Sequence, residues 1–444
     1  MDYKGIAEQL VSKCLKKGAD AAEVYIENGR NLSIEVRKGE VETVEEAASY
    51  GAGLRVFIKG KMAFASSNDL GERALDDALG RAIEFAKITT ADPNNVLPDD
   101  KGLTEIAGLF DPQVAKIPME RKIELAKKIE QLAMKDPRIT KSDGARYGEG
   151  EEEVVIANSN GLAKSFRSSV CSLGVSVVAE KGEQKSSGAE SSGARYFSDL
   201  KPAEEVAAKA ARDAYEMLDP KPLKTQKAPV IFHADVGYAL LGGILGAING
   251  ERVLQGASFL GKRLGQKIGS ELITLIDDGT LAKGIASQPF DGEGVSTQKR
   301  TIIDRGVLKG FMYNTIVAKR AGVQSTGNAR RGGFASLPGI GPHQFYMTAG
   351  QAKPEDIIKS TRAGLLVKEV TGYGINPVNG NFSGGASGFW VEDGKIAFSV
   401  KGLTIAGTAD EMLNGIEMVA DDLDLSRRMA TPSFRINLLQ IGGE

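Results

Sequence analysis

The stretch Leu32-Ser33-Ile34-Glu35-Val36-Arg37-Lys38-Gly39-Glu40-Val41 determines how the first part of this chain folds. Apolar and polar residues alternate from position 32 to position 36, and a period of two is typical of a half-buried β-strand. The Lys38-Gly39 pair that follows favours a tight turn, because glycine adopts positive φ angles at little cost. The stretch therefore predicts a β-hairpin.

Residues 1–90 are expected to form an α/β domain around this hairpin. An amphipathic helix precedes the alternating runs, and a second helix follows them at about residues 70–88. The dipeptides Asn28-Gly29 and Lys59-Gly60 are further turn signals. The segment is therefore predicted to contain several short strands joined as hairpins.

Residues 118–218 are expected to repeat this order as a second α/β domain. A helix begins the segment, Asn160-Gly161 predicts a hairpin, and a closing helix covers about residues 203–218. The stretches 91–117 and 219–228 are predicted linkers, because prolines cluster in both.

The last segment, residues 229–444, differs in composition from the first two. Of the 54 glycines in the chain, 35 lie in residues 228–444, where they separate many short apolar runs. Short strands joined by glycine turns indicate a β-rich domain. The predicted fold class is therefore α+β, with two helix–β-hairpins–helix segments followed by a glycine-rich, β-rich C-terminal domain.

Charge and cysteine content exclude several classes of function. Lys and Arg number 56 against 58 Asp and Glu, so the net charge of −2 gives no basic surface for nucleic acid or an anionic membrane. The N-terminus lacks the layout of a signal peptide, and no apolar run is long enough for a membrane-spanning helix. Only Cys14 and Cys171 occur, which suits a reducing compartment. We expect a cytoplasmic protein without a nucleic-acid or membrane partner.

Two glycine-rich stretches resemble catalytic motifs only superficially. Residues 256–263 come close to a phosphate-binding loop, but Arg263 stands where a Ser or Thr must ligate magnesium. Residues 385–389 approach the nucleophile elbow of serine hydrolases, but Phe389 replaces its last glycine. Neither nucleotide binding nor a serine hydrolase is favoured.

Two charged clusters are candidate binding sites. The carboxylates Asp277, Asp278, Asp291 and Glu293 lie close in sequence, but without the regular spacing of a calcium loop, so solvated turns are the favoured interpretation. The pairs Lys319-Arg320 and Arg330-Arg331 flank residues 325–328. They could contact an anion or a peptide carboxylate, although four cations in a near-neutral protein are usually a solvated surface.

The segment His233-Ala234-Asp235-Val236-Gly237-Tyr238 lies where a predicted strand meets a predicted helix. In a His-Glu-x-x-x-His zinc motif, two imidazoles bind the metal and the glutamate deprotonates the bound water. Here His233 matches the first ligand, Ala234 replaces the base and Tyr238 replaces the second ligand. A single histidine is more often a core or cap residue than a ligand.

Across nearly its full length the chain resembles the TldD/PmbA family, historically described as modulators of DNA gyrase. The shared motifs are Ala22–Tyr25, Glu35–Glu42, Gly51–Val56, Pro289–Val295, Gly306–Phe311, Ser325–Arg331, Asn376–Ser383 and Ala386–Trp390. Their joint occurrence in this order is specific to the family.

The resemblance implies a place in one branch of the family. In the TldD branch the zinc motif is intact, a C-terminal cysteine is the third ligand, and the proteins are metallopeptidases. This chain has Ala234 and Tyr238 in the motif and no cysteine after Cys171, as in the PmbA/TldE branch. That branch implies a protein without metal or cofactor that assembles with a TldD-type subunit.

The resemblance therefore predicts a non-catalytic subunit of a cytosolic metallopeptidase complex that trims or degrades peptides, without catalytic residues of its own. The expected partners are a TldD-type zinc subunit in a heterodimer, a second copy in a homodimer, and a peptide substrate. Two alternatives stay open: an independent metallopeptidase with an atypical site, and a binding protein that modulates gyrase. Within the shared motifs, side chains expected to contact peptide or partner are Asn328, Arg330, Arg331, Asn381, Ser383 and Ser387.

Overall fold

A computed structural model describes residues 1–100 and 102–443 of the chain. Its first half is built on one antiparallel sheet in the strand order β3-β2-β1-β4-β5-β6. The strands are β1 (Ala21–Arg37), β2 (Glu40–Ile58), β3 (Lys61–Ser67), β4 (Ile139–Asn158), β5 (Ala163–Lys181) and β6 (Gln184–Ala194). Because β1 pairs with β4 from Glu23↔Asn158 to Val36↔Ala145, the two helix–strand–helix segments share a single sheet.

The turns between these strands agree with the sequence at three of the four predicted places. Lys38-Gly39 and Lys59-Gly60 connect β1 to β2 and β2 to β3 with positive φ angles, and Gly161 turns the chain between β4 and β5. The turn predicted at Asn28-Gly29 was wrong, because both residues lie inside β1 and pair with β2 and β4. Strand pairing on both sides outweighs the local turn preference of this dipeptide.

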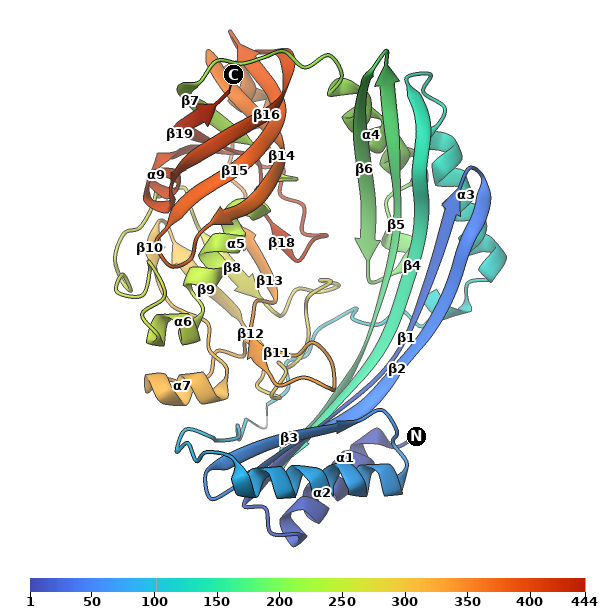
Figure 1. The fold of residues 1–444 in the computed structure, drawn as a ribbon, viewed down its shortest axis with the longest axis vertical. Helices are drawn as coiled ribbons and strands as arrows, with labels where there is room; N and C mark the ends of the chain where they lie inside the picture. The colour runs from blue at the N-terminus through green and yellow to red at the C-terminus, as the bar shows by residue number, and fades with distance from the viewer. Residues whose placement is uncertain (101, 444) are drawn as a thin grey trace.

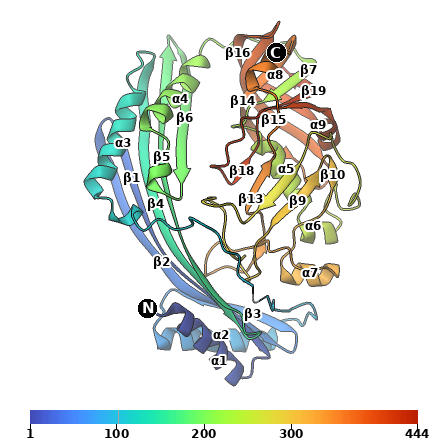
Figure 2. The same cartoon turned by 180° about the vertical axis from the view of Figure 1, so that it is seen from behind.

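Four helices cover one face of this sheet, and they are α1 (Tyr3–Lys16), α2 (Glu72–Ile88), α3 (Met119–Ala133) and α4 (Ala203–Glu216). The even-numbered residues of β1 face them: Val24 and Ile26 pack with α1 and α2, and Leu32 and Ile34 pack with α3. The sheet curves so that its other face turns toward the C-terminal half (Figures 1 and 2). The odd-numbered residues of β1 therefore point toward that half.

The C-terminal half contains a barrel-like sheet in the order β16-β15-β14-β7-β19-β17, with β16 also pairing with β19. These strands are β7 (Gln226–Phe232), β14 (Ala363–Ile375), β15 (Asn381–Glu392), β16 (Lys395–Thr408), β17 (Ile416–Val419) and β19 (Phe434–Gly442). A five-stranded sheet in the order β10-β9-β8-β13-β18 lies beside it, together with the pair β11-β12. The α+β class predicted from the sequence is confirmed.

The remaining elements are short. The strands are β8 (Leu275–Asp278), β9 (Lys299–Asp304), β10 (Val307–Leu308), β11 (Ala329–Arg330), β12 (Gly339–Ile340), β13 (Gln344–Met347) and β18 (Met429–Ala430). The helices are α5 (Tyr238–Ala247), α6 (Gly250–Leu254), α7 (Thr315–Ala321), α8 (Pro354–Lys359) and α9 (Ala409–Gly415). One large apolar core joins the two C-terminal sheets. None of the helices in the described residues has the length and apolarity to cross a membrane.

Candidate functional site

His233 lies directly after β7, in the turn that leads into α5, where the sequence places the degenerate zinc motif. Its backbone N–H donates to Val367 O at 3.2 Å, which holds the turn against β14. At Gly237 a Cβ atom would come within 1.7 Å of Thr431 Oγ1, so only glycine fits there. The C-terminal segment that contains Thr431 therefore packs directly on the motif.

The same segment also uses its polar groups to hold the motif in place. Ala234 N donates to Ser433 Oγ at 3.0 Å, and Ser433 Oγ donates to Asp422 Oδ2 at 2.7 Å. Under the family resemblance a cysteine thiolate of this C-terminal region would be the third zinc ligand. Here the region supplies a hydroxyl that is already hydrogen-bonded to the chain.

Both ring nitrogens of His233 have partners. Nδ1 lies 3.2 Å from Asp235 Oδ2, and Nε2 lies 3.4 Å from Lys368 Nζ. Nδ1 also lies 3.2 Å from the backbone N–H of Asp235. If Nδ1–H donates to the carboxylate, the lone pair of Nε2 accepts from the lysine ammonium; if Nδ1 accepts the backbone N–H of Asp235, Nε2 carries the ring proton and has no lone pair for a metal. In either tautomer, Nε2 faces a cation and is not free to bind a metal.

The carboxylates around His233 are paired with cations as well. Lys209 Nζ lies within 2.7 to 3.0 Å of carboxylate oxygens of Glu190, Asp213 and Asp235, and Arg427 reaches Asp235 at 3.0 Å. Burial alone would raise the pKa of Asp235, but the hydrogen bond to His233 and the charge of Lys209 hold this pKa far below its usual range. No carboxylate of this cluster is left without a positive partner.

The residues at the motif do not fit zinc. A catalytic zinc site needs three protein ligands and an open position, whereas His233 is followed by the methyl group of Ala234 and by Tyr238, which is 45% exposed. Within residues 1–100 and 102–443, no group of three or more His, Cys, Asp or Glu side chains could hold a metal ion. Cys14 and Cys171 are buried in α1 and β5, and burial raises the pKa of each thiol to about 12.

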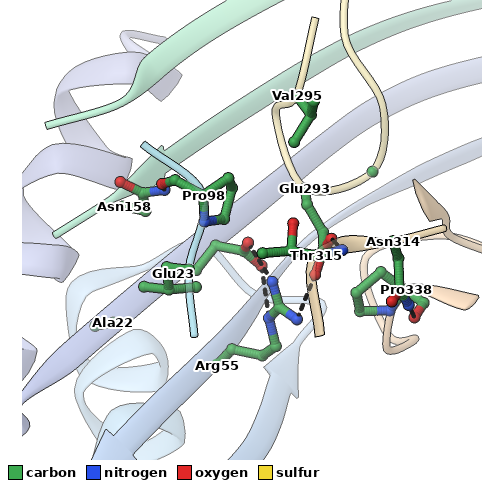
Figure 3. Close-up of polar contacts among 12 residues, drawn as sticks. Ala22, Glu23, Arg55, Pro98, Asn158, Glu293, Val295, Asn314, Thr315 and Pro338 are labelled. Carbon is green, nitrogen blue, oxygen red and sulfur yellow. Dashed lines mark hydrogen bonds and ion pairs between the residues drawn. The ribbon is translucent and has the colours of Figure 1, made fainter. Parts of the chain in front are cut away.

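A second polar centre joins the curved sheet to the C-terminal half (Figure 3). Arg55 of β2 donates to Glu23 of β1 at 2.6 Å and to Glu293 at 2.9 Å, and all three side chains are buried. Arg331 forms a further ion pair with Glu23. Glu293 also accepts from the backbone N–H of Thr315 at 2.7 Å. Four of the shared sequence motifs therefore meet in one buried ion network.

The interpretation of Asp277, Asp278, Asp291 and Glu293 as solvated turn residues was wrong, because each is at most 2% exposed. Asp291 accepts backbone hydrogen bonds from Glu293, Val295 and Ala329 at 2.9 to 3.0 Å. Burial and the neighbouring Glu293 raise the pKa of Asp291. These carboxylates are retained in the interior because backbone and side-chain donors satisfy them.

The residues expected to contact peptide or partner fall into different environments. Asn328 is buried and donates to Asp277 Oδ2 at 2.6 Å, so it supports the interior. Arg331 was expected on a solvated surface, but its side chain is 2% exposed because it pairs with Glu23. Arg330 lines a cavity beneath the curved sheet.

The three candidates on β15 lie apart from Arg330, on the barrel-like sheet. Asn381 and Ser383 are exposed, and Ser387 is half-buried. All three have odd numbers on one strand, so they share a face of the sheet up to the β-bulge near Ser387. The structure brings these three together on one strand.

Sequence reasoning missed Lys209 and Lys368, which take part in the ion pairs around His233. Lys209 lies on α4 and Lys368 on β14, far from the motif in sequence, and neither belongs to a recognisable pattern. Only the pairing of distant elements places them at the site.

Three family models match the chain in order. They are PmbA/TldA metallopeptidase domain 1 at residues 22–86, the central domain at residues 112–218 and the C-terminal domain at residues 225–443. Among curated relatives, Metalloprotease PmbA of Escherichia coli O157:H7 is 34% identical, with 99% of this chain and 96% of the relative aligned. A TldD homologue of Haemophilus influenzae is 27% identical over 96% of this chain and 94% of its own length.

Solved structures resemble the chain over its whole length. A Bacteroides thetaiotaomicron protein described as a proposed modulator of DNA gyrase superposes with a TM-score of 0.92 at 27% identity, covering both chains completely. TldE from Thermococcus kodakarensis gives a TM-score of 0.90 at 26% identity, covering 99% of this chain and 100% of that one. The chain therefore belongs to the PmbA/TldD metallopeptidase family.

Proposed function

We propose that this chain is a non-catalytic subunit of a TldD-type metallopeptidase complex that acts on peptides in the cytoplasm. The observation that carries the proposal is the contact between Lys368 Nζ and His233 Nε2. An ammonium 3.4 Å from that nitrogen opposes the binding of a divalent cation there by charge repulsion. Ala234 also removes the general base that such a peptidase needs.

The full-length family match supports a role that needs the whole fold. The chain keeps the curved sheet, the sheets of the C-terminal half and the buried Arg55 network between the two halves, although its zinc motif is degenerate. A subunit that shapes the chamber around a partner's zinc needs the whole fold, because its surface must be preserved. It does not need zinc ligands of its own. We expect a heterodimer with a TldD-type subunit, and a homodimer of this chain when that subunit is absent.

Co-expression tests the proposal directly. This chain and the TldD-type protein of the same organism are produced separately and together, and native mass and hydrolysis of an unstructured peptide are measured. We expect a one-to-one complex that cleaves the peptide faster than the TldD-type protein alone. The proposal is wrong if the two stay apart at micromolar concentration and the partner cleaves equally well alone.

Two other outcomes would favour the alternatives. The curated relatives are named metalloproteases, so chelator-sensitive hydrolysis by this chain alone would indicate an independent metallopeptidase. Solved relatives carry descriptions as proposed modulators of DNA gyrase, so co-purification with gyrase in the absence of a TldD-type protein would favour a gyrase-binding role.

A further inference from the structure

A cavity of about 370 Å³ lies between the curved sheet and the C-terminal half. Its floor is formed by β1, β4 and β5 on the face that carries no helices, and Arg330 and Arg428 contribute from the C-terminal half. Arg330 belongs to β11, and Arg428 directly precedes β18. Figure 1 shows both strands on the side of the C-terminal half that faces the sheet.

Two of the arginines that line the cavity have no acidic partner. Among the described residues, neither Arg330 nor Arg428 makes an ion pair or a side-chain hydrogen bond, whereas the adjacent Arg331 pairs with Glu23. Burial lowers the pKa of Arg330, and the nearby Arg428 lowers it further. Arg330 is half-buried and Arg428 is exposed, so it is the guanidinium of Arg330 that has lost hydration, which a carboxylate could replace with two parallel hydrogen bonds.

The floor of the same cavity is acidic. Glu27 and Glu152 lie on adjacent strands, where Glu152 pairs with Gly29 in the register of β1 and β4. Burial raises the pKa of both carboxyls, and the charge of Glu27 contributes to the rise at Glu152. Oε2 of Glu27 is buried without a hydrogen-bond partner among the described residues.

A third arginine of the cavity, Arg195, holds the curved sheet to a loop of the C-terminal half. Arg195 donates to backbone oxygens of Ser169, Gly284, Ile285 and Ser287 at 2.8 to 3.1 Å. These bonds tie the end of β6 to the loop that forms one wall. Because its donors are committed to the backbone, Arg195 neutralises neither the floor nor the incoming ligand by direct pairing.

From this arrangement we propose that the cavity binds a peptide segment that carries both a carboxylate and a cationic side chain. The carboxylate pairs with Arg330 and Arg428, and the cation lies between Glu27 and Glu152. The small residues Gly29, Ser49 and Gly150 also line the cavity and leave space for a main chain. Only the choice of a peptide as the ligand rests on the proposed function.

Binding of labelled hexapeptides to this chain alone tests the inference. The reference peptide is uncharged except for a C-terminal lysine with a free carboxylate. A second peptide is amidated at that carboxylate, a third has norleucine in place of the lysine, and a fourth is amidated but has glutamate beside the lysine. The fourth distinguishes a side-chain carboxylate from a chain-end carboxylate.

We expect the reference peptide to bind roughly tenfold or more tightly than the second or third, as for the loss of a charged hydrogen bond. Arg330→Gln should remove the difference between the first and second peptides, and Glu152→Gln should remove the difference between the first and third. Arg362→Gln is the matched control. Arg362 is an exposed arginine that directly precedes β14 and does not line the cavity, so its replacement should leave all affinities unchanged.

Equal affinities for the four peptides, or equal losses for every peptide in Arg330→Gln, would overturn the inference. Circular dichroism of each variant establishes that it is folded before binding is compared. Because the measurement uses no partner, its failure leaves the co-expression test unaffected. Failure of complex formation would in turn leave peptide binding by the isolated chain intact.

Discussion

Replacing Arg55 with methionine should loosen the joint between the curved sheet and the C-terminal half. Arg55 is the side-chain cation that pairs with Glu293, and it shares Glu23 with Arg331. Methionine is unbranched and apolar, so it replaces the aliphatic part of the Arg55 side chain and removes its charge. Among the described residues, the backbone N–H of Thr315 is then the remaining hydrogen-bond donor to the buried Glu293.

The expected loss follows from the number of carboxylates left unpaired. Removing one partner of a buried ion pair typically costs about 3–5 kcal/mol, because the remaining charge is stranded away from water. Glu23 keeps its ion pair with Arg331, so Glu293 is the one carboxylate that loses its cation. We expect Arg55→Met to lower the free energy of unfolding by about 3–5 kcal/mol at pH 7.5.

The loss should depend on pH with a definite sign. A stranded carboxylate has a folded-state pKa above its unfolded value, so it is accommodated when protonated and becomes destabilising as pH rises through the folded-state pKa. The difference from the natural chain should therefore shrink between pH 7.5 and pH 5. Arg55→Met with Glu293→Gln should recover part of the loss at pH 7.5, because the charge itself is gone.

Urea unfolding followed by fluorescence is a suitable assay, since the single tryptophan, Trp390, lies in β15 of the C-terminal half. Far-ultraviolet circular dichroism follows both halves, and divergence of the two signals would reveal separate unfolding of the halves. Arg362→Met is a control at an exposed position. A loss below about 1 kcal/mol, or a loss that does not change with pH, would contradict the argument.

Three further outcomes follow from the site. Ala234→Glu with Tyr238→His should still bind no stoichiometric zinc, because Lys368 remains at His233 Nε2; one zinc per chain by elemental analysis after dialysis would refute this. Gly237→Ala should destabilise the chain by about 1–3 kcal/mol through overpacking against Thr431. Adding Thr431→Ala to that variant should recover part of the lost stability, as measured by thermal unfolding. The thiols of Cys14 and Cys171 should resist a thiol reagent at pH 8, because burial raises the pKa of each to about 12. Both thiols should react once urea unfolds the chain. Rapid reaction of the folded protein would contradict their burial.

The sequence predicted the local elements of the fold well, and long-range pairing less well. Lys38-Gly39 and Lys59-Gly60 form turns because the strands on either side end there, so local chemistry and the sheet agree. Asn28-Gly29 carries the same local signal, but β2 and β4 both continue past it. Its strand conformation depends on partners 20 or more residues away, which no local pattern contains.

The candidate site shows the same division. His233 lies at the predicted strand-to-helix junction, because the apolar run of β7 and the following glycine mark that junction in the sequence. The burial of Asp291 and Glu293 was not predictable, because it depends on donors from β2, β11 and α7. A carboxylate in a glycine-rich stretch reads as solvated unless its distant donors are known.

The position of Lys368 gives a physical reason why the fold can persist without zinc under the proposed function. In a metal site, the positive charge of the ion offsets the cost of burying nearby carboxylates. Here Lys368 lies 3.8 Å from Asp213, Lys209 bridges Asp213 and Asp235, and Arg427 adds a further contact to Asp235. Protein cations thus provide the charge that an ion would supply. Removing Lys368 alone would vacate His233 Nε2 without creating the missing ligands, so loss of the lysine and gain of metal binding are separate changes.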